Sequence, residues 1–351
     1  MSKAPTTLAV RLDNAGDVLL TGPALRALAH RSARLLLLVG PNGSAAAELL
    51  PMVDEVMVWD CPWISPDPRP VEPEDIRSLA TELAEADIDQ AVIFTSFHQS
   101  PLPTALVLRM AGIGWVSAIS EDYPGSLLDV RHRVTGDPPE AERALSLARA
   151  SGFELPPGDP GRLAITADLP SVGHLVPAGP YDVVHPGASV PARAWQPERM
   201  AAACALLSER GHQVVVTGSP AETCLTDFVA GAHARNLGGR TSLAELASVL
   251  AAASAVVVGN TGPAHLAAAV GTPVVSLFAP TVPAARWAPY GVPVILLGDQ
   301  EAGCRNTRAT SCPIEGHPCL GRVEPLDVLI AVEKLCGARH RSPALTAGEP
   351  R

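Results

Sequence analysis

AVVVGNTGPAHLAAAVGTPVVSLF, residues 255–278, consists of a short apolar run, a helical segment and a second apolar run. Short apolar runs bounded by Gly and Pro are typical of strands buried on both faces. Pro263 suits the first turn of a helix, where its missing N–H is not needed. The stretch therefore predicts a strand–helix–strand unit, the building block of a parallel sheet with helices on both faces.

The same alternation runs through the rest of the chain. It predicts strands in the first half at residues 8–12, 35–39, 56–59, 91–95 and 116–119, with helices between them, for example at 23–32 and 75–85. In the second half it predicts strands at 181–184, 213–217, 255–258, 274–278 and 294–297, and helices at 197–210, 221–232, 242–252, 263–270 and 325–335.

Residues 154–180 separate these halves, because they are rich in Pro and Gly and lack helical periodicity. We interpret this stretch as the crossing between two domains. The sequence thus predicts an α/β protein with doubly wound parallel-sheet domains at 1–170 and 171–336, and a disordered tail at 337–351. Two such domains in sequence are expected to bind ligands at the carboxyl ends of their strands, across a cleft.

Composition and charge limit the classes of function. The 351 residues are 47% hydrophobic and 18% charged, as in globular proteins, and no apolar run is long enough to span a bilayer. The N-terminus lacks the pattern of a signal peptide, so we expect a cytoplasmic protein without integral membrane association. Residues 1–175 carry 13 Lys and Arg against 23 Asp and Glu. This acidic half disfavours nucleic acid and anionic membranes as its partners.

The seven cysteines are odd in number and widely spread, so they do not indicate a disulfide framework. Cys304, Cys312 and Cys319 lie close together, with His317 between the last two, but they include no C-x-x-C pair. We interpret this region as a loop that contains cysteines, with a zinc site as the less favoured alternative, and we predict no metal site.

Three segments of the second half follow predicted strands and carry polar residues. In the first, Asn260, Thr261 and Gly262 open a helix whose free N–H groups and dipole favour an anion. An ordinary capped helix is the alternative, but it does not explain His265 one turn later. In the second, HPGASVPARAW (185–195), Arg193 offers a planar fork of donors to a diphosphate, although a solvated arginine is also common.

The third segment is TGSPAE (217–222), where Glu222 either caps a helix or binds ribose hydroxyls. In the first half of the chain, Gly16 and Asp17 follow the first predicted strand, and Asp17 alone would be interpreted as a helix cap. The sequence contains no G-x-G-x-x-G after its first strand, no P-loop motif and no nucleophile elbow. These absences disfavour dinucleotide oxidoreductases, P-loop enzymes and α/β-hydrolases.

Taken in order, these segments resemble glycosyltransferase family 9, which includes the ADP-heptose heptosyltransferases of lipopolysaccharide core assembly. The resemblance runs from Arg11 to about Leu335. It rests on AGDVLLTGPALRAL, HPGASVPARAW, TGSPAE, NLGGRTSLAELASVLAAAS, GNTGPAHLAAAVGTPVV and FAPTVPAARWAPYG. It implies a GT-B fold, in which two Rossmann-like domains face each other across a central cleft. It also implies inverting transfer from a nucleotide-sugar, most simply an ADP-linked one, with no metal and no further cofactor.

The resemblance also implies site residues by position. Asp17 would be the general base, and Arg193 would stabilise the leaving diphosphate with the help of Ser189. Glu222 would bind the ribose, and the turn containing Thr241, Ser242 and Leu243 would bind the adenine. Residues expected around the phosphates and the sugar are Asn260, Thr261, Gly262 and His265.

Two positions depart from the family pattern: Asn260 stands where Asp is more frequent, and Arg193 stands where Lys is frequent. The identity of the transferred sugar is therefore less determined than the type of donor. Acceptor-binding candidates are residues after strands of the first domain, namely Asn14, Ser96, His98, Gln99 and Asp122.

Because the first domain is acidic, we expect a small neutral or cationic acceptor, such as a metabolite that contains an aminosugar, and not a polyanionic lipid. Two other classes remain open from the sequence. A two-lobed sugar-nucleotide epimerase would share the architecture, and a non-catalytic protein that binds sugar-nucleotides would share the donor domain. The sequence does not determine the oligomeric state.

Overall fold

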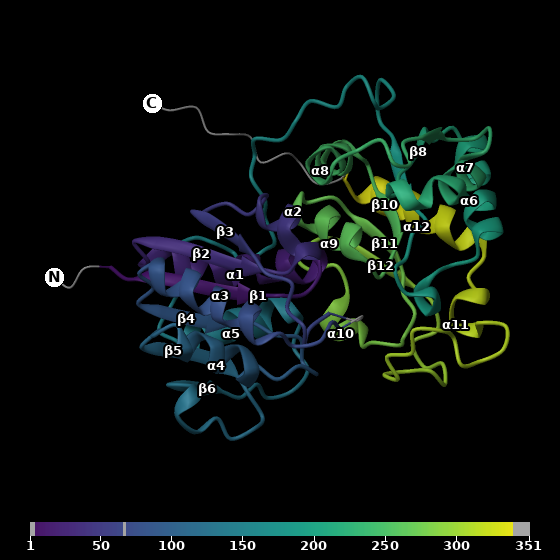
Figure 1. Ribbon diagram of the computed structural model, residues 1–351. Helices are drawn as coiled ribbons and strands as arrows, with labels where there is room; N and C mark the ends of the chain where they lie inside the picture. Colours follow the sequence, from purple (N-terminus) through teal and green to yellow (C-terminus); the bar gives the residue numbers. More distant parts are fainter. Residues whose placement is uncertain (1–3, 66–67, 340–351) are drawn as a thin grey trace, which may run out of the picture. The chain divides into compact units, whose positions relative to one another are not determined.

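The computed structural model describes residues 4–65 and 68–339, and these form two compact units (Figure 1). Unit 1 consists of the chain up to Leu169 together with a short later segment, Ala285–Gly291. Unit 2 begins at Pro170, is interrupted by that short segment and resumes at Val292. Each unit has its own parallel sheet of six strands and its own helices.

Unit 1 has the strand order β3-β2-β1-β4-β5-β6. Its strands are β1 (Thr6–Arg11), β2 (Arg34–Val39), β3 (Glu55–Val58), β4 (Gln90–Ile93), β5 (Trp115–Ile119) and β6 (Val130–His132). Its helices are α1 (Ala15–Arg31), α2 (Ser44–Ala47), α3 (Pro73–Glu85), α4 (Leu102–Met110) and α5 (Glu140–Ala150). Because the order reverses beside β1, the turns after β1 and β4 lie at a topological switch point, where ligands usually bind in such sheets.

Unit 2 repeats this topology, with the order β12-β11-β10-β7-β8-β9. Its strands are β7 (Asp182–His185), β8 (Val214–Val216), β9 (Arg235–Asn236), β10 (Val256–Gly259), β11 (Val274–Leu277) and β12 (Val294–Leu297). Its helices are α6 (Pro197–Glu209), α7 (Thr223–Ala230), α8 (Leu243–Ala252), α9 (Gly262–Ala269), α11 (Pro318–Gly321) and α12 (Pro325–Arg339). The switch point of this sheet lies between β7 and β10.

The ten predicted strands are confirmed to within two residues at each end. The apolar runs of eight of them are largely buried, whereas the edge strands β3 and β12 are partly exposed. The strands β6 and β9 were not predicted; they are edge strands of three and two residues with polar sequences. The prediction that the first helix begins at Pro23 is wrong. α1 begins at Ala15 and includes Pro23, so that Asp17 lies in its first turn and not before it.

The segment Ala285–Gly291 leaves the sheet of unit 2 between β11 and β12 and packs on unit 1. It carries the end of a short helix, α10 (Ala284–Trp287). The guanidinium of Arg286 pairs with Asp137 and lies 4.2 Å from the ring centroid of Phe97. The hydroxyl of Tyr290 donates to Glu142 at 3.2 Å. The alternating pattern of the sequence does not indicate this excursion.

The C-terminal helix is longer than expected. It continues to Arg339, beyond the predicted end at residue 335, and the remainder of the expected tail lies outside the described residues. Among the helices of the described segments, none is both long and apolar enough to cross a membrane.

Candidate functional site

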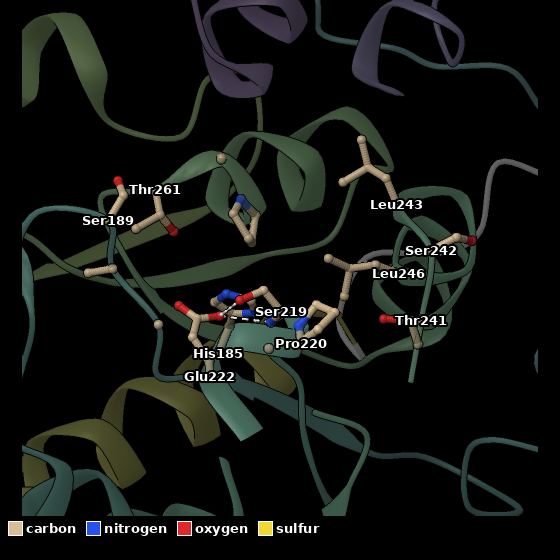
Figure 2. Close-up of a pocket in the computed structure, with 15 residues that line it drawn as sticks. His185, Ser189, Ser219, Pro220, Glu222, Thr241, Ser242, Leu243, Leu246 and Thr261 are labelled. Carbon is tan, nitrogen blue, oxygen red and sulfur yellow. Dashed lines mark hydrogen bonds between the residues drawn. The ribbon is translucent and has the colours of Figure 1, made fainter. Parts of the chain in front are cut away.

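Unit 2 contains a pocket of about 350 Å³ at the carboxyl ends of β7, β8 and β10 (Figure 2). Three turns that follow these strands, together with the first turn of α8, form its walls. The residues that line it are His185, Gly187, Ala188, Ser189, Gly218, Ser219, Pro220, Glu222, Thr241, Ser242, Leu243, Leu246, Thr261, Gly262 and Pro263. The pocket thus occupies the switch point at which this topology places ligands.

One side of the pocket is suited to an anion. Ser189 and Thr261 lie there, beside the first turn of α9, whose N–H groups and dipole favour negative charge (Figure 2). The hydroxyl of Thr261 does not cap the helix, and this buried Oγ1 has no hydrogen-bond partner in the described structure. The same is true of Nδ1 of His265, one turn into α9. Buried polar atoms without partners cost free energy, and Thr261, which lines the pocket, can offer its Oγ1 to a polar ligand.

The opposite side is more apolar. Leu243 and Leu246 come from the same face of α8, three residues apart, and Thr241 and Ser242 lie beside them (Figure 2). Ser242 starts α8 with a capping box in which Glu245 accepts the Ser242 N–H at 2.8 Å. This bonding fixes the turn. An apolar wall with a polar rim is a typical surface for a nucleobase.

The floor of the pocket is formed around Glu222. Its Oε2 accepts hydrogen bonds from the N–H and the hydroxyl of Ser219, both at 2.7 Å. Oε1 of Glu222 lies against the backbone of Gly187, where a Cβ atom would be only 2.0 Å away. Gly187 is therefore the residue that allows a carboxylate to lie beside the turn after β7.

His185 at the end of β7 also lines the pocket. Its Nδ1 lies 3.0 Å from Oγ1 of Thr217, and burial lowers its pKa to about 4, against the opposing effect of the Glu222 charge. The ring is therefore neutral at pH 7, so it can form hydrogen bonds with a ligand but carries no positive charge. The sequence pattern placed His185 after a strand but assigned it no role.

Six of the predicted donor-binding residues line this pocket: Ser189, Glu222, Thr241, Leu243, Thr261 and Gly262. Arg193, Asn260 and His265 are not among its lining residues. Asn260 and His265 are buried, and the pKa of His265 is lowered to about 4, first by burial and then by the nearby charge of Arg193. Arg193 and His265 are thus neighbours next to the anion-binding side. The lining residues without a predicted role, Pro220 and Leu246 among them, lie within motifs that the sequence analysis quoted.

Unit 1 holds Asp17 in a cluster of charged side chains at the end of β1. Nη2 of Arg11 donates to Oδ1 of Asp17 at 3.0 Å and to Oγ of Ser96 at 3.1 Å, while its Nε lies 2.9 Å from Oδ2 of Asp13. The Asp17 side chain keeps 15% of its surface exposed. Burial raises its pKa to about 6 against the lowering effect of Arg11, and the charges of Asp13 and Glu140 raise it further.

Two of the predicted acceptor-binding residues, Ser96 and Gln99, support this cluster. Nε2 of Gln99 donates to Asp13 at 2.5 Å, and Oε1 of Gln99 accepts the N–H of Ser96 at 2.9 Å. His98 is exposed and lies edge-to-face against Phe97, and Asp122 is exposed beyond the end of β5. The structure therefore joins Ser96 and Gln99 to Asp13 and Arg11.

A second pocket of about 240 Å³ lies beside this cluster in unit 1. It is lined by Leu12, Asp13, Asn14, Gly40, Pro41, Asn42, Asp60, Cys61, Ile64 and Ser65. Of the predicted acceptor-binding residues, Asn14 is the one that lines it. A Cβ atom on Gly40 would lie 2.5 Å from the carbonyl oxygen of Leu12, so glycine is required for the close approach of the turns after β1 and β2.

Within residues 4–65 and 68–339, no three or more His, Cys, Asp and Glu side chains are arranged to hold a metal ion. Cys304 and Cys319 are buried, and burial raises the pKa of the Cys319 thiol to about 11.

Comparison with solved structures shows which folds are similar. A family 9 glycosyltransferase from Veillonella parvula is 17% identical, with a TM-score of 0.79 over 96% of this chain and 99% of that one. Escherichia coli ADP-heptose lipopolysaccharide heptosyltransferase II is 22% identical, with a TM-score of 0.73 over 95% and 99% of the two chains. E. coli heptosyltransferase WaaC with ADP-2-deoxy-2-fluoro heptose is 21% identical, with a TM-score of 0.68 over 94% and 99%. The fold is therefore of the GT-B type.

Sequence comparison identifies the family. A search of curated proteins found no match. The profile of glycosyltransferase family 9 (heptosyltransferase) matches residues 76–317, more than half of the chain, including all the turns that form the pocket of unit 2. The protein is therefore a glycosyltransferase, and the chain belongs to glycosyltransferase family 9.

Proposed function

We propose that the protein transfers a sugar, most simply heptose from ADP-heptose, to an acceptor hydroxyl, with inversion at the anomeric carbon and without a metal ion. In this proposal unit 2 binds the donor and unit 1 supplies the base and binds the acceptor. One observation carries it: the pocket of unit 2 combines an apolar wall with a helix N-terminus, as a nucleotide diphosphate requires.

The donor fits the pocket in three parts. The adenine lies against Leu243 and Leu246, the ribose hydroxyls donate to Glu222, and the diphosphate accepts from Thr261 and the first N–H groups of α9. Arg193 adds a positive charge next to His265. The choice of ADP and heptose is supported by the similar E. coli protein that binds ADP-2-deoxy-2-fluoro heptose.

The first prediction concerns the base of the donor. ADP-heptose and ADP are expected to raise the melting temperature more than UDP-, GDP- or TDP-sugars do. A ligand at 100 times its Kd adds about 2.7 kcal/mol to the free energy of unfolding. Leu246→Ser should abolish the shift relative to the variant's own ligand-free melting temperature, because it removes part of the apolar wall.

Leu326→Ser is the matched control, because Leu326 is exposed on α12 and does not line the pocket. The nucleotide-induced shift should be unchanged in this variant. Stabilisation by UDP-, GDP- or TDP-sugars alone would mean that the assigned base is wrong.

The chemistry is a single displacement. The acceptor oxygen attacks the anomeric carbon, the bond from that carbon to the diphosphate oxygen breaks, and the acceptor proton passes to Asp17. The new bond forms opposite the departing diphosphate, so the anomeric configuration inverts. The growing negative charge on the diphosphate is stabilised by Arg193 and the N–H groups of α9. These fixed positive groups take the role that a divalent cation would otherwise have.

The acceptor is proposed to be a small neutral or cationic molecule. The second pocket of unit 1 adjoins the Asp17 cluster through Asp13 and Asn14. Its lining residues include two carboxylates, Asp13 and Asp60, and no Lys or Arg. Asp13 is paired with Arg11 and Asp60 with Arg69 behind the lining. The lining therefore offers acceptors to hydroxyl and ammonium groups but no cation to a phosphate.

The second prediction concerns the reaction. With ADP-heptose and EDTA present, the protein should release ADP in the presence of aminosugar-containing or neutral oligosaccharide acceptors. NMR of the product should show an inverted anomeric linkage. The EDTA should not lower the rate, and phosphorylated lipid acceptors should give less product at equal concentration.

Each outcome has a defined meaning. Transfer to phosphorylated lipids alone would contradict the acceptor class, and a loss of rate with EDTA that Mg²⁺ restores would contradict metal independence. Release of a free epimerised sugar without an acceptor would contradict transfer as the reaction.

A further inference from the structure

Asp17 lies among more negative than positive charge. The cluster around it contains three carboxylates, from Asp13, Asp17 and Glu140, and two guanidinium groups, from Arg11 and Arg143. Arg11, Glu140 and Arg143 are buried, and Asp13 and Asp17 are partly buried. Arg11 contacts both aspartates directly at 2.9 to 3.0 Å. One guanidinium that is shared between two carboxylates cannot neutralise both of them.

Glu140 reaches this cluster from a distant part of the chain. It is the first residue of α5, a helix that packs along α1, and its side chain is 2% exposed. Oε2 of Glu140 lies 3.3 Å from Nη1 of Arg143, which also donates to the carbonyl oxygen of Thr95 at 2.6 Å. Arg143 is thus anchored to the chain directly after β4, next to Ser96.

The bonding of Glu140 is incomplete. Its Oε1 atom is buried and has no hydrogen-bond partner in the described structure. A glutamate in the first helical turn is normally solvated, and a buried carboxylate oxygen without a donor reduces the stability of the fold. Helix capping does not explain it either, because the α5 cap has no side-chain hydrogen bond. The buried position of Glu140 is therefore unfavourable for the stability of the fold, and helix capping does not account for it.

We propose that Glu140 is a positioning residue for the transfer reaction: its buried negative charge counteracts Arg11, so that Asp17 is held in place by Arg11 and still remains a useful base. The inference rests on the proposed role of Asp17 as the base. It differs from that role because it concerns Glu140, which lines neither of the two pockets described above.

The physical argument concerns proton affinity. Arg11 orients Asp17, but a cation at 3.0 Å also favours the ionised carboxylate and makes it a weaker base. A general base is most effective when its proton affinity matches the working pH. The charges that face Asp17 are Arg11 from β1, Asp13 from the next turn and Glu140 from α5, with Arg143 beside Glu140. The two carboxylates oppose the effect of Arg11.

The third prediction is a displaced pH profile for Glu140→Gln. The variant removes one negative charge at nearly constant volume, so ionised Asp17 is favoured. The midpoint of the acid limb of kcat/KM should move to lower pH, by about one unit. The maximal kcat should fall several-fold, because the base is weaker. The Kd of ADP, which binds to unit 2, should not change.

Glu142→Gln provides the matched control. It makes the same substitution two residues later on α5, but Glu142 is exposed. Its pH profile should coincide with that of the unmodified protein. Glu140→Asp keeps the charge, so its midpoint should stay closer to the original one than the midpoint of Glu140→Gln does. If Glu140 acted only through the length of its side chain, Glu140→Asp would not preserve the midpoint better than Glu140→Gln.

Arg143→Gln supplies a test of opposite sign. It leaves Glu140 without its cation, so the midpoint should move to higher pH. If only one of Glu140→Gln and Arg143→Gln folds, as judged by its melting curve, the direction of its shift decides the inference. An unchanged midpoint in a folded variant would overturn it. If Asp17→Asn retained activity, the proposed base itself would be wrong, which is a separate outcome.

Discussion

Asp17→Asn is expected to lower kcat by about 10²- to 10⁴-fold, the usual contribution of a general base. The amide keeps the size of the side chain and the contact with Arg11 but cannot take the proton of the acceptor. The donor pocket consists of residues of unit 2, so the affinity for ADP should stay within a few-fold. Initial rates with ADP-heptose and isothermal titration with ADP measure the two quantities.

Loss of folding is not expected to explain this effect. The pKa of Asp17 is raised to about 6, above the ordinary value of 3.8, so the folded protein binds this proton more tightly than the unfolded chain does. Stability from this group is complete below about pH 4 and is lost as the pH rises through about 6. At pH 7 the neutral asparagine should therefore melt at the same or a higher temperature.

The control for this variant is Asp168→Asn, an exposed aspartate of the same unit. It should retain full activity. In the unmodified protein, kcat/KM should rise with pH through about 6, as Asp17 loses its proton. An Asp17→Asn protein that kept a tenth or more of its activity would remove Asp17 from the mechanism.

The fold was readily predicted from the sequence because its central strands are short apolar runs separated by helices. In Leu8–Val10 and Val256–Val258, for example, every side chain is fully buried, so hydrophobicity alone locates the strand. The start of α1 was mispredicted because Pro23 is a common signal for a helix start, yet here it lies within the helix. Nothing comparable marks the excursion of Ala285–Gly291, since its contacts depend on residues far away in the sequence.

The pocket of unit 2 was predicted in outline for a related reason. In a parallel sheet the turns after adjacent strands meet at one edge, so post-strand residues such as Ser189, Glu222 and Thr261 were expected together. The surroundings of Asp17 were not foreseeable in this way. Glu140 lies 123 positions after Asp17, and its charge acts on Asp17 because α5 packs on α1. Charge compensation of this kind requires the tertiary structure.

Arg193→Met is expected to lower kcat by about 10²- to 10³-fold, the typical cost of losing one donor to a developing negative charge. Arg193 ends the short 3₁₀ turn after β7, and its charge acts on the buried ring of His265 in α9. Since negative charge on the diphosphate grows as the sugar leaves, the loss should appear mainly in kcat, with a smaller change in the Kd of ADP.

Two further substitutions make this result specific. Arg193→Lys should recover part of the rate, because it restores the charge but not the planar pair of donors, and lysine is frequent at this position in the resembled family. Arg210→Met is the control and should leave kcat unchanged. Arg210 is an exposed arginine at the C-terminal end of α6, and its Nη1 lies 3.7 Å from Oε1 of Glu333. If Arg193→Met raised KM while kcat stayed constant, Arg193 would bind the donor equally in the ground and transition states. The leaving group would then depend on the N–H groups of α9 for its stabilisation.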